Sequence, residues 1–410
     1  ARNSPAIPDV PNWFNLPPRF GVAYDLTGDA KTALKGTVNK YNRSFLVDLA
    51  GQYNPLDQVT DTRNRRDCDY IPGTSTCSGR ALTTNGDDIA QDNEIGPSNN
   101  RLFGAAPNRH FDPDSKRPYD IEYTLGVDRE VARGLSVGVT WIRKDSYDLQ
   151  QTINRAVNAS DYTSFQVPNP LLNGEILTIY NLNPNKQGQV DLLDTTADNS
   201  KAGLHFNGFD VNVSARLPGG GNLFGGWTAA KLVHVNCQYV LFTDIDLYYP
   251  HLSIASDPNA QRNCDQTQLD IPYRHGFKLA GNYPLPLGLM VGLSAVSLPG
   301  SLIGSAIADQ SLRTNWNVRA NLFRGGRTQT VNVRLDEPGS QWLERWYQLD
   351  LNLRKVFSVG RARFEPGVDV YNVFNTNPVL TENQQFGSSL GTPMRVLQGR
   401  LMRLTTQINF

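Results

Sequence analysis

The four cysteines are the residues whose type and spacing most directly suggest chemistry. They fall into two local pairs, Cys68 with Cys77 and Cys237 with Cys264, each inside a polar, turn-rich segment. Neither pair has the Cys-x-x-Cys spacing that is typical of zinc sites and thioredoxin-like redox centres. Local pairs of this kind predict two loop disulfides and therefore an oxidising compartment, with four reduced thiols in a cytosolic protein as the alternative.

Two polar segments are further candidates for binding. Asp87, Asp88 and Asp92 form an acidic cluster that is a weak calcium candidate, because its spacing differs from that of an EF-hand loop; a solvated acidic loop is the simpler interpretation. The arginine-rich segment 61–66 predicts a surface loop, or a contact with an anionic ligand or lipopolysaccharide.

The sequence contains no motif that indicates catalysis. Its 5 histidines are scattered, and none belongs to a His-Glu-x-x-His arrangement. The run Gly219–Gly221 follows a predicted strand, but no helix and no Lys-Ser/Thr pair follow it, so it predicts a turn rather than a phosphate-binding loop. We therefore expect a non-enzymatic protein with no catalytic residues and no cofactor, apart from the weak calcium candidate.

Composition narrows the class of protein further. The chain has 410 residues, with 39 Lys plus Arg against 39 Asp plus Glu, so no net field favours nucleic acid as a partner. Hydrophobic residues make up 39%, which is low for a helical membrane protein but sufficient for a barrel with a polar interior. The 35 Gly and 25 Pro residues indicate many turns, and the chain as a whole predicts an all-β fold.

The final segment, 400–410, shows an alternation of apolar and polar residues that predicts the kind of strand connected by these polar segments. Leu404, Ile408 and Phe410 alternate with polar residues, and a period of two predicts a strand with one apolar face. A strand of about ten residues, tilted by about 45°, can cross the hydrocarbon layer of a bilayer. Because an edge strand needs a partner, we expect this strand to close a transmembrane β-barrel. The alternative is the last strand of a soluble sandwich.

The same alternation recurs along the chain. The resulting strand candidates cover 19–26, 34–41, 121–127, 135–141, 209–216, 224–235, 329–335, 347–356 and 362–374. Charged residues on their polar faces are expected to line the lumen, because an Arg or Lys facing lipid costs about 2–4 kcal/mol at mid-depth. These lumen candidates are Asp210, Arg216, Asp350, Arg354 and Asp369.

One uncharged run, Leu279–Ala308, is long enough for a membrane-spanning helix. Three prolines and several glycines interrupt it, and each interior Pro costs a helix about 3 kcal/mol. The run therefore predicts a hairpin, with a first strand that ends at Tyr283, a turn at Pro284–Gly288 and a second strand at Leu289–Leu298.

Connections between the strands alternate in length. Short turns are expected at 27–29, 132–134, 218–222, 284–288 and 358–361, and long loops at 42–118, 145–207, 236–272 and 375–397. An outer-membrane barrel has short periplasmic turns and long extracellular loops. After an irregular lead-in at 1–18, the sequence thus predicts an antiparallel, up-and-down transmembrane β-barrel over 19–410, with about 12 to 14 strands visible.

Several of these strands resemble one family of outer-membrane proteins. Residues 18–26 (PRFGVAYDL), followed by 31–35 (KTALK), are similar to a strand pair of TonB-dependent receptors, specifically of the Oar-like branch with its carboxypeptidase-regulatory-like domain. Segments 207–211 (NGFDV), 347–351 (YQLDL) and 369–375 (DVYNVFN) resemble other barrel strands of that branch. The end of the chain, closing on Phe410, resembles the signal read by the outer-membrane assembly machinery.

This resemblance implies the C-terminal part of a 22-stranded barrel, because the family's plug domain and TonB box have no counterpart in the sequence. It implies a bacterial outer-membrane receptor for TonB-dependent uptake of a large or scarce ligand that the sequence does not identify. Expected partners are membrane lipid, lipopolysaccharide and, if the full chain has them, a plug domain and TonB. Alternatives are a passive pore, a structural or adhesive surface barrel, and a soluble secreted carbohydrate-binding β-protein.

Overall fold

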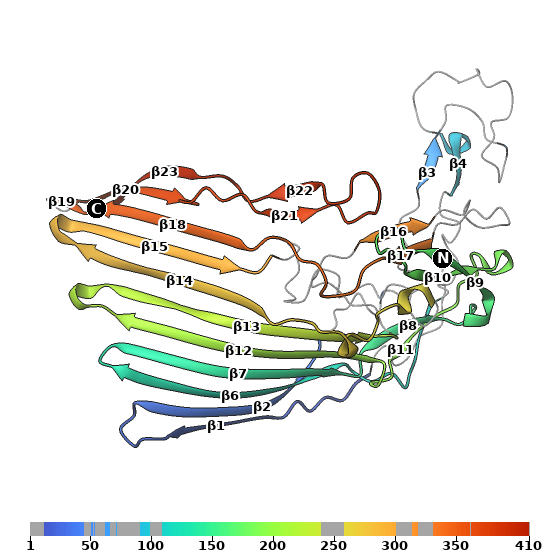
Figure 1. Cartoon of the computed structure of the whole chain (residues 1–410), viewed down its shortest axis with the longest axis horizontal. Coiled ribbons are helices and arrows are strands. Elements are labelled where there is room, and N and C mark those ends of the chain that lie inside the picture. Colours follow the sequence, from blue (N-terminus) through green and yellow to red (C-terminus); the bar gives the residue numbers. More distant parts are fainter. Residues whose placement is uncertain are drawn as a thin grey trace.

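The computed structural model describes residues 12–44, 51, 53, 62–65, 71, 91–98, 109–238, 258–300, 314–318, 331–360 and 362–409. Antiparallel β-strands dominate these residues, and the largest unit is a 12-stranded sheet. Figure 1 shows its long strands side by side across the molecule. The prediction of an all-β, antiparallel fold is confirmed.

The strands of this main sheet follow one another along the chain. They are β1 (Arg19–Asp25), β2 (Thr32–Asn42), β6 (Tyr119–Ala132), β7 (Leu135–Tyr147), β12 (Ala202–Arg216), β13 (Asn222–Asn236), β14 (Arg274–Leu285), β15 (Leu289–Leu298), β18 (Trp346–Lys355), β19 (Phe357–Val359), β20 (Ala362–Tyr371) and β23 (Leu401–Asn409). Each pairs with its predecessor, except that β18 and β19 are consecutive pieces that both pair with β20. This order is that of an up-and-down meander.

Two edges bound the sheet within the part of the chain that the structure describes. Strand β1 pairs only with β2, and β23 pairs only with β20. The closing segment expected at 400–410 thus forms an antiparallel strand from Leu401 to Asn409, and Phe410 lies outside the described residues. The described strands form an open sheet.

Short and long connections lie at opposite ends of the sheet (Figure 1). The short ones follow Asp25, Ala132, Arg216, Leu285 and Val359. The hairpin expected over the uncharged run is present as β14 and β15, with β14 two residues longer than predicted. Its turn places Leu287 and Gly288 at φ 65° and 71°, a conformation in which glycine at the second position avoids a side-chain clash. No helix among the described residues has the length and apolarity needed to cross a membrane.

The long connections carry small sheets of their own. These contain β3 (Arg63–Arg65) with β4 (Ile95–Ser98), β5 (Arg109–Phe111) with β11 (Leu192–Thr196) and β8 (Gln150–Asn154), β9 (Tyr162–Pro168) with β10 (Ile176–Leu182), β16 (Asn315–Val318) with β17 (Val331–Arg334), and β21 (Val379–Glu382) with β22 (Pro393–Val396). Short 3-10 helices accompany them: η1 (Asp92–Glu94), η2 (Ala159–Asp161), η3 (Pro184–Lys186), η6 (Pro258–Gln261) and η7 (Gln266–Gln268), whereas η4 (Pro218–Gly220) and η8 (Pro286–Gly288) lie in the short turns.

One predicted strand has a different place from the one expected. The alternating segment 329–335 was counted with the barrel strands, but β17 pairs only with β16, outside the main sheet. The main sheet has no place for it, because β15 pairs directly with β18 from Leu289↔Lys355 onwards. Residues 299–345 therefore form a fifth long connection, which the sequence pattern did not indicate.

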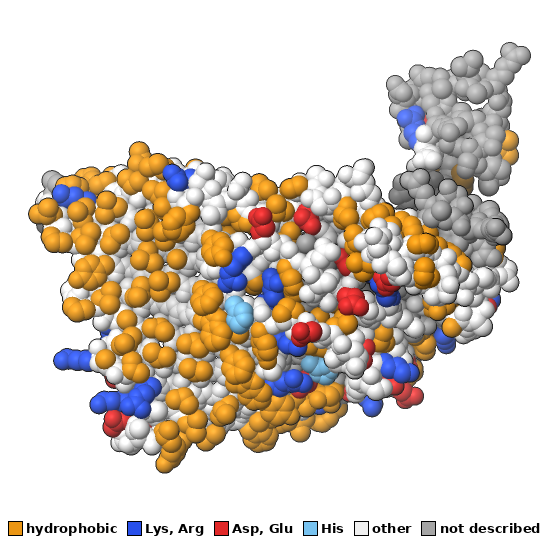
Figure 2. Space-filling model, in the orientation of Figure 1, with side chains coloured by type: hydrophobic (Ala, Val, Ile, Leu, Met, Phe, Trp, Pro, Cys, Tyr) orange, Lys and Arg blue, Asp and Glu red, His pale blue; other side chains and the backbone are white. Residues whose placement is uncertain are grey.

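The register divides the main sheet into two chemically different faces. Val211 of β12 is paired with Val139 and Trp227, whereas the next residue, Asn212, is paired with Gly138 and Gly226. Because successive side chains point to opposite faces, one face is apolar over many strands and the other is polar. Figure 2 shows a broad band of hydrophobic side chains across the strands, with charged side chains at the short-turn end and toward the long connections. Leu404 on the apolar face is 80% exposed.

Candidate functional site

The long connections pack on one another into a compact unit, which we name the loop cap and define as β5, β8–β11, β16, β17 and η6. Its hydrophobic core contains Leu177 and Ile179 of β10 together with Val318, Val333 and Leu335. These side chains are almost completely buried, and the residues come from two connections more than a hundred positions apart. Burial of this kind stabilises the cap as a folded unit rather than a set of independent loops.

Polar side chains fasten a third connection to the same unit. Arg262, next to η6, donates to the Glu175 carboxylate at 2.6 Å and to the carbonyl oxygen of Leu335 at 3.3 Å. Asn259 of η6 pairs with the backbone of Tyr180, accepting from its N–H and donating to its carbonyl, both at 2.7 Å. Hydrogen bonds with a charged partner are the stronger kind, so Arg262 is the main polar link between these connections.

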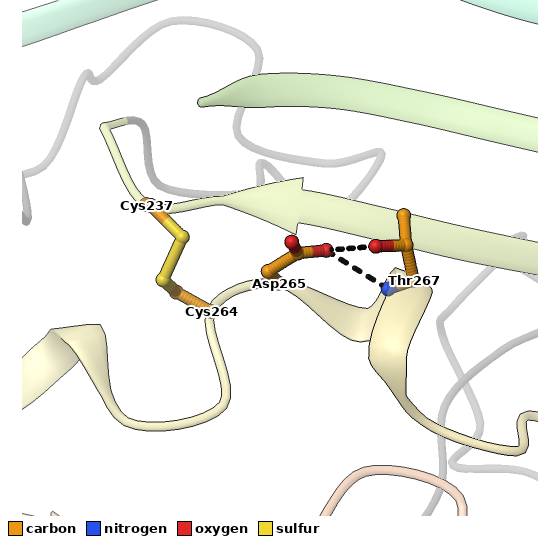
Figure 3. The surroundings of a disulfide bond; sticks show 4 residues. All are labelled: Cys237, Cys264, Asp265 and Thr267. Carbon is orange, nitrogen blue, oxygen red and sulfur yellow. Dashed lines mark hydrogen bonds between the residues drawn. A yellow bond between two sulfur atoms is a disulfide. The ribbon is translucent and has the colours of Figure 1, made fainter. Parts of the chain in front are cut away.

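A disulfide closes the same connection at its base (Figure 3). Cys237, directly after β13, is bonded to Cys264, with Cα atoms 4.8 Å apart and a separation of 27 positions in sequence. The adjacent Asp265 accepts from the backbone N–H and hydroxyl of Thr267 at 2.9 and 2.6 Å and so begins η7. The disulfide predicted for this pair is present in the structure, and it ties the connection to the end of a sheet strand.

A buried carboxylate holds the other side of the cap. Asp194 of β11 is 3% exposed and accepts from Arg109 through Nε and Nη2 at 2.5 and 2.9 Å. It also accepts from the hydroxyl of Tyr53 at 2.5 Å and from that of Thr152. Burial, and secondarily the Asp194 charge, raises the pKa of the Tyr53 hydroxyl. Sequence reasoning missed this cluster, because its four members lie on four separate segments and no local spacing relates them.

The five predicted lumen residues lie on the polar face of the main sheet. Asp210, Arg216, Asp350, Arg354 and Asp369 share this face by register. Asp369 is 4% exposed, and it accepts from Arg354 at 3.3 Å and from Arg403 at 2.8 Å. Asp350 accepts from the backbone N–H of Asn372 and from Gln348. Arg216 and Asp210 are not part of the Asp369 cluster.

A recess of 730 Å³ lies on this polar face between β6 and β15. Side chains of both charges reach it, including Asp128, Asp210 and Lys278, together with Asn212 and Ser294. The recess is large enough for a small ligand, and its walls offer hydrogen bonds rather than a reactive group.

The remaining predicted sites fall mostly outside the described residues. This applies to Cys68 and Cys77 and to two residues of the calcium candidate, Asp87 and Asp88. The third, Asp92, is exposed in η1. In the part of the chain that the structure describes, no group of three or more His, Cys, Asp or Glu side chains is arranged to hold a metal ion. Within the arginine-rich segment, Arg65 pairs with the buried Glu94 at 3.2 Å.

The arrangement as a whole suits binding, because the packed loop cap lies at one end of a sheet that is polar on one face and apolar on the other. The chain belongs to the Outer membrane beta barrel domain family, whose model matches residues 3–300. The protein is accordingly a β-barrel protein of the bacterial outer membrane, which confirms the predicted localisation. No curated protein matches the sequence.

Solved structures of transporters and receptors are similar to the chain at low identity. The outer membrane transporter YddB from Escherichia coli has a TM-score of 0.46 and 10% identity over 96% of this chain and 40% of that one. The ferric-catecholate import receptor Fiu from E. coli has a TM-score of 0.42 and 15% identity over 95% and 34%. The siderophore receptor PirA from Acinetobacter baumannii has a TM-score of 0.42 and 13% identity over 96% and 40%. The chain thus spans well under half the length of these proteins.

Proposed function

We propose that this chain supplies part of the wall and the outer loops of a TonB-dependent receptor that takes up a large or scarce ligand. The observation that carries the proposal is the pairing of two features: a packed loop cap and a continuous polar face beneath it. A passive pore needs only a polar wall, whereas a receptor must also hold its ligand in a preorganised site. The sequence resemblance of strands such as 18–26 and 369–375 supports the same class of protein.

The sheet edges support a barrel larger than the described strands. Both β1 and β23 present unpaired backbone groups along one side in the described structure. Strands that cross a membrane must satisfy every backbone hydrogen bond, so each of these edges requires a partner strand. We infer that they pair with a complementary set of strands, which completes the expected 22-stranded wall around a plug domain.

The short connections lie at one end of the sheet and the long connections at the other, and this arrangement supports an orientation of the protein in the membrane. Outer-membrane barrels carry their long loops outside the cell and their short turns in the periplasm, so the loop cap faces the medium. Cysteine substitution tests this orientation with a membrane-impermeant maleimide on intact cells. Ser200→Cys, in a long connection, is expected to label on intact cells, whereas Thr27→Cys, in a short turn, labels only after lysis. The reverse pattern would overturn the orientation.

Single-channel conductance in planar bilayers tests the function itself, using the protein purified from outer membranes. A plugged receptor is expected to show no stable open steps and to bind the periplasmic domain of TonB. Stable open conductance without TonB binding would favour a passive pore. A protein that shows neither stable open conductance nor TonB binding would favour a structural or adhesive barrel.

A further inference from the structure

A second polar site lies at the long-connection end of the apolar face, away from the polar wall. It borders the loop cap, because Lys116 is hydrogen-bonded through its backbone to Gln150 of β8 and Thr196 of β11. It is a cavity of 340 Å³ beside the long-connection ends of β2 and β6, lined by Trp13, Lys40, Lys116, Arg117 and Tyr119 among others. Three of these side chains are cations, and one carboxylate, Asp148, also reaches the cavity. This volume lies at the lower end of the range of small-molecule sites.

The walls of the cavity are fixed by hydrogen bonds between distant segments. The indole N–H of Trp13 donates to the carbonyl of Ser115 at 2.6 Å, and Arg117 Nε donates to the carbonyl of Arg43 at 2.8 Å. The backbone N–H of Lys40 donates to the carbonyl of Pro18 at 2.9 Å. These contacts hold the lead-in segment against β2, so the site exists before any ligand arrives.

Two of the three cations in this cavity lie over aromatic rings instead of carboxylates. The Lys40 ammonium lies 3.8 Å from the centre of the Tyr119 ring, and the Arg117 guanidinium lies 5.9 Å from that of Trp13. Among the described residues, Lys40, Lys116 and Arg117 form no ion pair, whereas nearby Arg43 and Lys144 both pair with Asp120. Because most of this positive charge is not neutralised within the protein, the cavity favours an anion.

The position of the cavity identifies the source of that anion. Lys40 lies on the apolar face of the sheet, in line with the exposed Val38 and the half-buried Leu34, two and six residues earlier in β2. Phe14 and Leu16, which also line the cavity, are 96% and 76% exposed. Cations directly beyond an apolar membrane-facing surface lie at headgroup depth, and exposed apolar side chains beside them suit acyl chains.

We propose that this cavity binds the phosphate of a phosphorylated lipid headgroup in the outer leaflet, with Lys40, Lys116 and Arg117 as its ligands. Asp148 keeps its charge and accepts from the Asn199 amide at 3.0 Å, and three cations against this one carboxylate leave the cavity with a net positive charge. The proposal rests on the orientation given above, in which the long connections face outward. It names a lipid of the surrounding membrane and is independent of the transported ligand.

Lipid binding by the full chain, purified from membranes in a nonionic detergent, tests the proposal. The probe is fluorescent bis-phosphorylated lipid A in mixed micelles. The triple variant Lys40→Gln/Lys116→Gln/Arg117→Gln is expected to bind it at least about tenfold more weakly, because each charge-assisted contact to phosphate is lost. The matched control Lys31→Gln/Arg129→Gln/Arg133→Gln removes the same charge from the short-turn end and is expected to bind as the parent protein does.

Two further arms separate the lipid from a soluble anion. Dephosphorylated lipid A is expected to bind the parent protein as weakly as the triple variant binds the intact probe. Inorganic phosphate is expected not to displace the probe, and full displacement by it would overturn the assignment to a lipid. Equal binding by parent and triple variant would overturn the site.

Loss of heat-dependent gel mobility would mean that the triple variant does not fold. In that case the double variant Lys40→Gln/Lys116→Gln, which keeps the Arg117–Arg43 hydrogen bond, replaces it in the binding test. Maleimide labelling keeps this inference separate from the proposed function. If labelling places the long connections outside and lipid binding is nevertheless unchanged in the variants, only the lipid site is wrong.

Discussion

Arg403 of β23 reaches across the sheet to Asp369 of β20, donating through Nε at 3.0 Å and Nη2 at 2.8 Å to the same carboxylate oxygen. These two residues are also directly opposite each other in the strand register. Arg354 of β18 donates to the second oxygen, so one buried carboxylate connects three successive strands on the polar face. Because β23 is held in the described sheet by β20 alone, this pair helps to fix the last strand.

Asp369→Asn is expected to weaken the attachment of β23. The substitution removes the charge that Arg354 and Arg403 share, and loss of charged hydrogen bonds at a buried carboxylate costs about 1–3 kcal/mol. Urea unfolding, followed by heat-dependent gel mobility, measures the change. Asp128→Asn is the matched control, because its pair with Lys35 at 2.7 Å is half-exposed and contributes little. Equal losses in the two variants would contradict the assignment.

Arg262→Gln is expected to loosen the loop cap without affecting the main sheet. Its guanidinium bridges Glu175 and Leu335, which belong to two different connections. Loss of a charged link of about 1–2 kcal/mol raises local opening by roughly tenfold. Hydrogen exchange of residues 162–182 and 331–335 reports this opening. Arg155→Gln, which removes an exposed partner of Asp191, serves as the control and leaves these rates unchanged if the bridge is specific.

Reduction of the Cys237–Cys264 disulfide is expected to release the connection after β13. A cross-link that closes a loop of this length contributes about 2–4 kcal/mol. Limited proteolysis with and without reductant should therefore reveal new cleavage within residues 258–264, while the strands of the main sheet stay intact. Cys237→Ser/Cys264→Ser should reproduce the pattern without reductant. Unchanged cleavage would show that the other contacts of the cap suffice.

Alkaline pH is expected to weaken the Asp194 cluster through Tyr53. The folded protein holds the pKa of Tyr53 above its ordinary value of about 10, because the buried hydroxyl donates to a carboxylate. The neutral hydroxyl is therefore stabilised by folding, and this contribution is complete below pH 10 and is lost as pH rises further. The difference in ultraviolet absorbance between the parent protein and Tyr53→Phe should show no tyrosinate signal at pH 10. A signal with an ordinary midpoint would contradict the buried hydrogen bond.

The sequence predicted the main sheet well because its information is local. A period of two assigns Val211 and Asn212 to opposite faces, and the proline-turned hairpin after Leu279 follows from turn chemistry over a few residues. The Cys237–Cys264 disulfide was also predictable, since its partners lie within a single polar segment.

The loop cap could not be predicted in the same way. Ile179 and Val333 sit in short apolar runs within polar connections, and their burial depends on packing between segments that are distant in sequence. The run at 329–335 has the alternation of a membrane strand, and only the direct pairing of β15 with β18 excludes it from the main sheet. Side chains such as Arg109 and Arg262 carry no local signal, because their partners come from other connections.

Charge placed on either face of β12 tests which side of the sheet meets lipid. Val211→Arg puts a cation on the apolar face, level with Val139 and Trp227, and is expected to cost about 2–4 kcal/mol at mid-depth. Asn212→Arg puts the same cation on the polar face beside the recess, where water and the Asp210 carboxylate can solvate it, so we expect almost no loss. The two variants share strand, depth and side chain and differ only in direction. Urea unfolding in detergent-solubilised and lipid-reconstituted protein compares them, and equal destabilisation would mean that the apolar face does not contact the membrane.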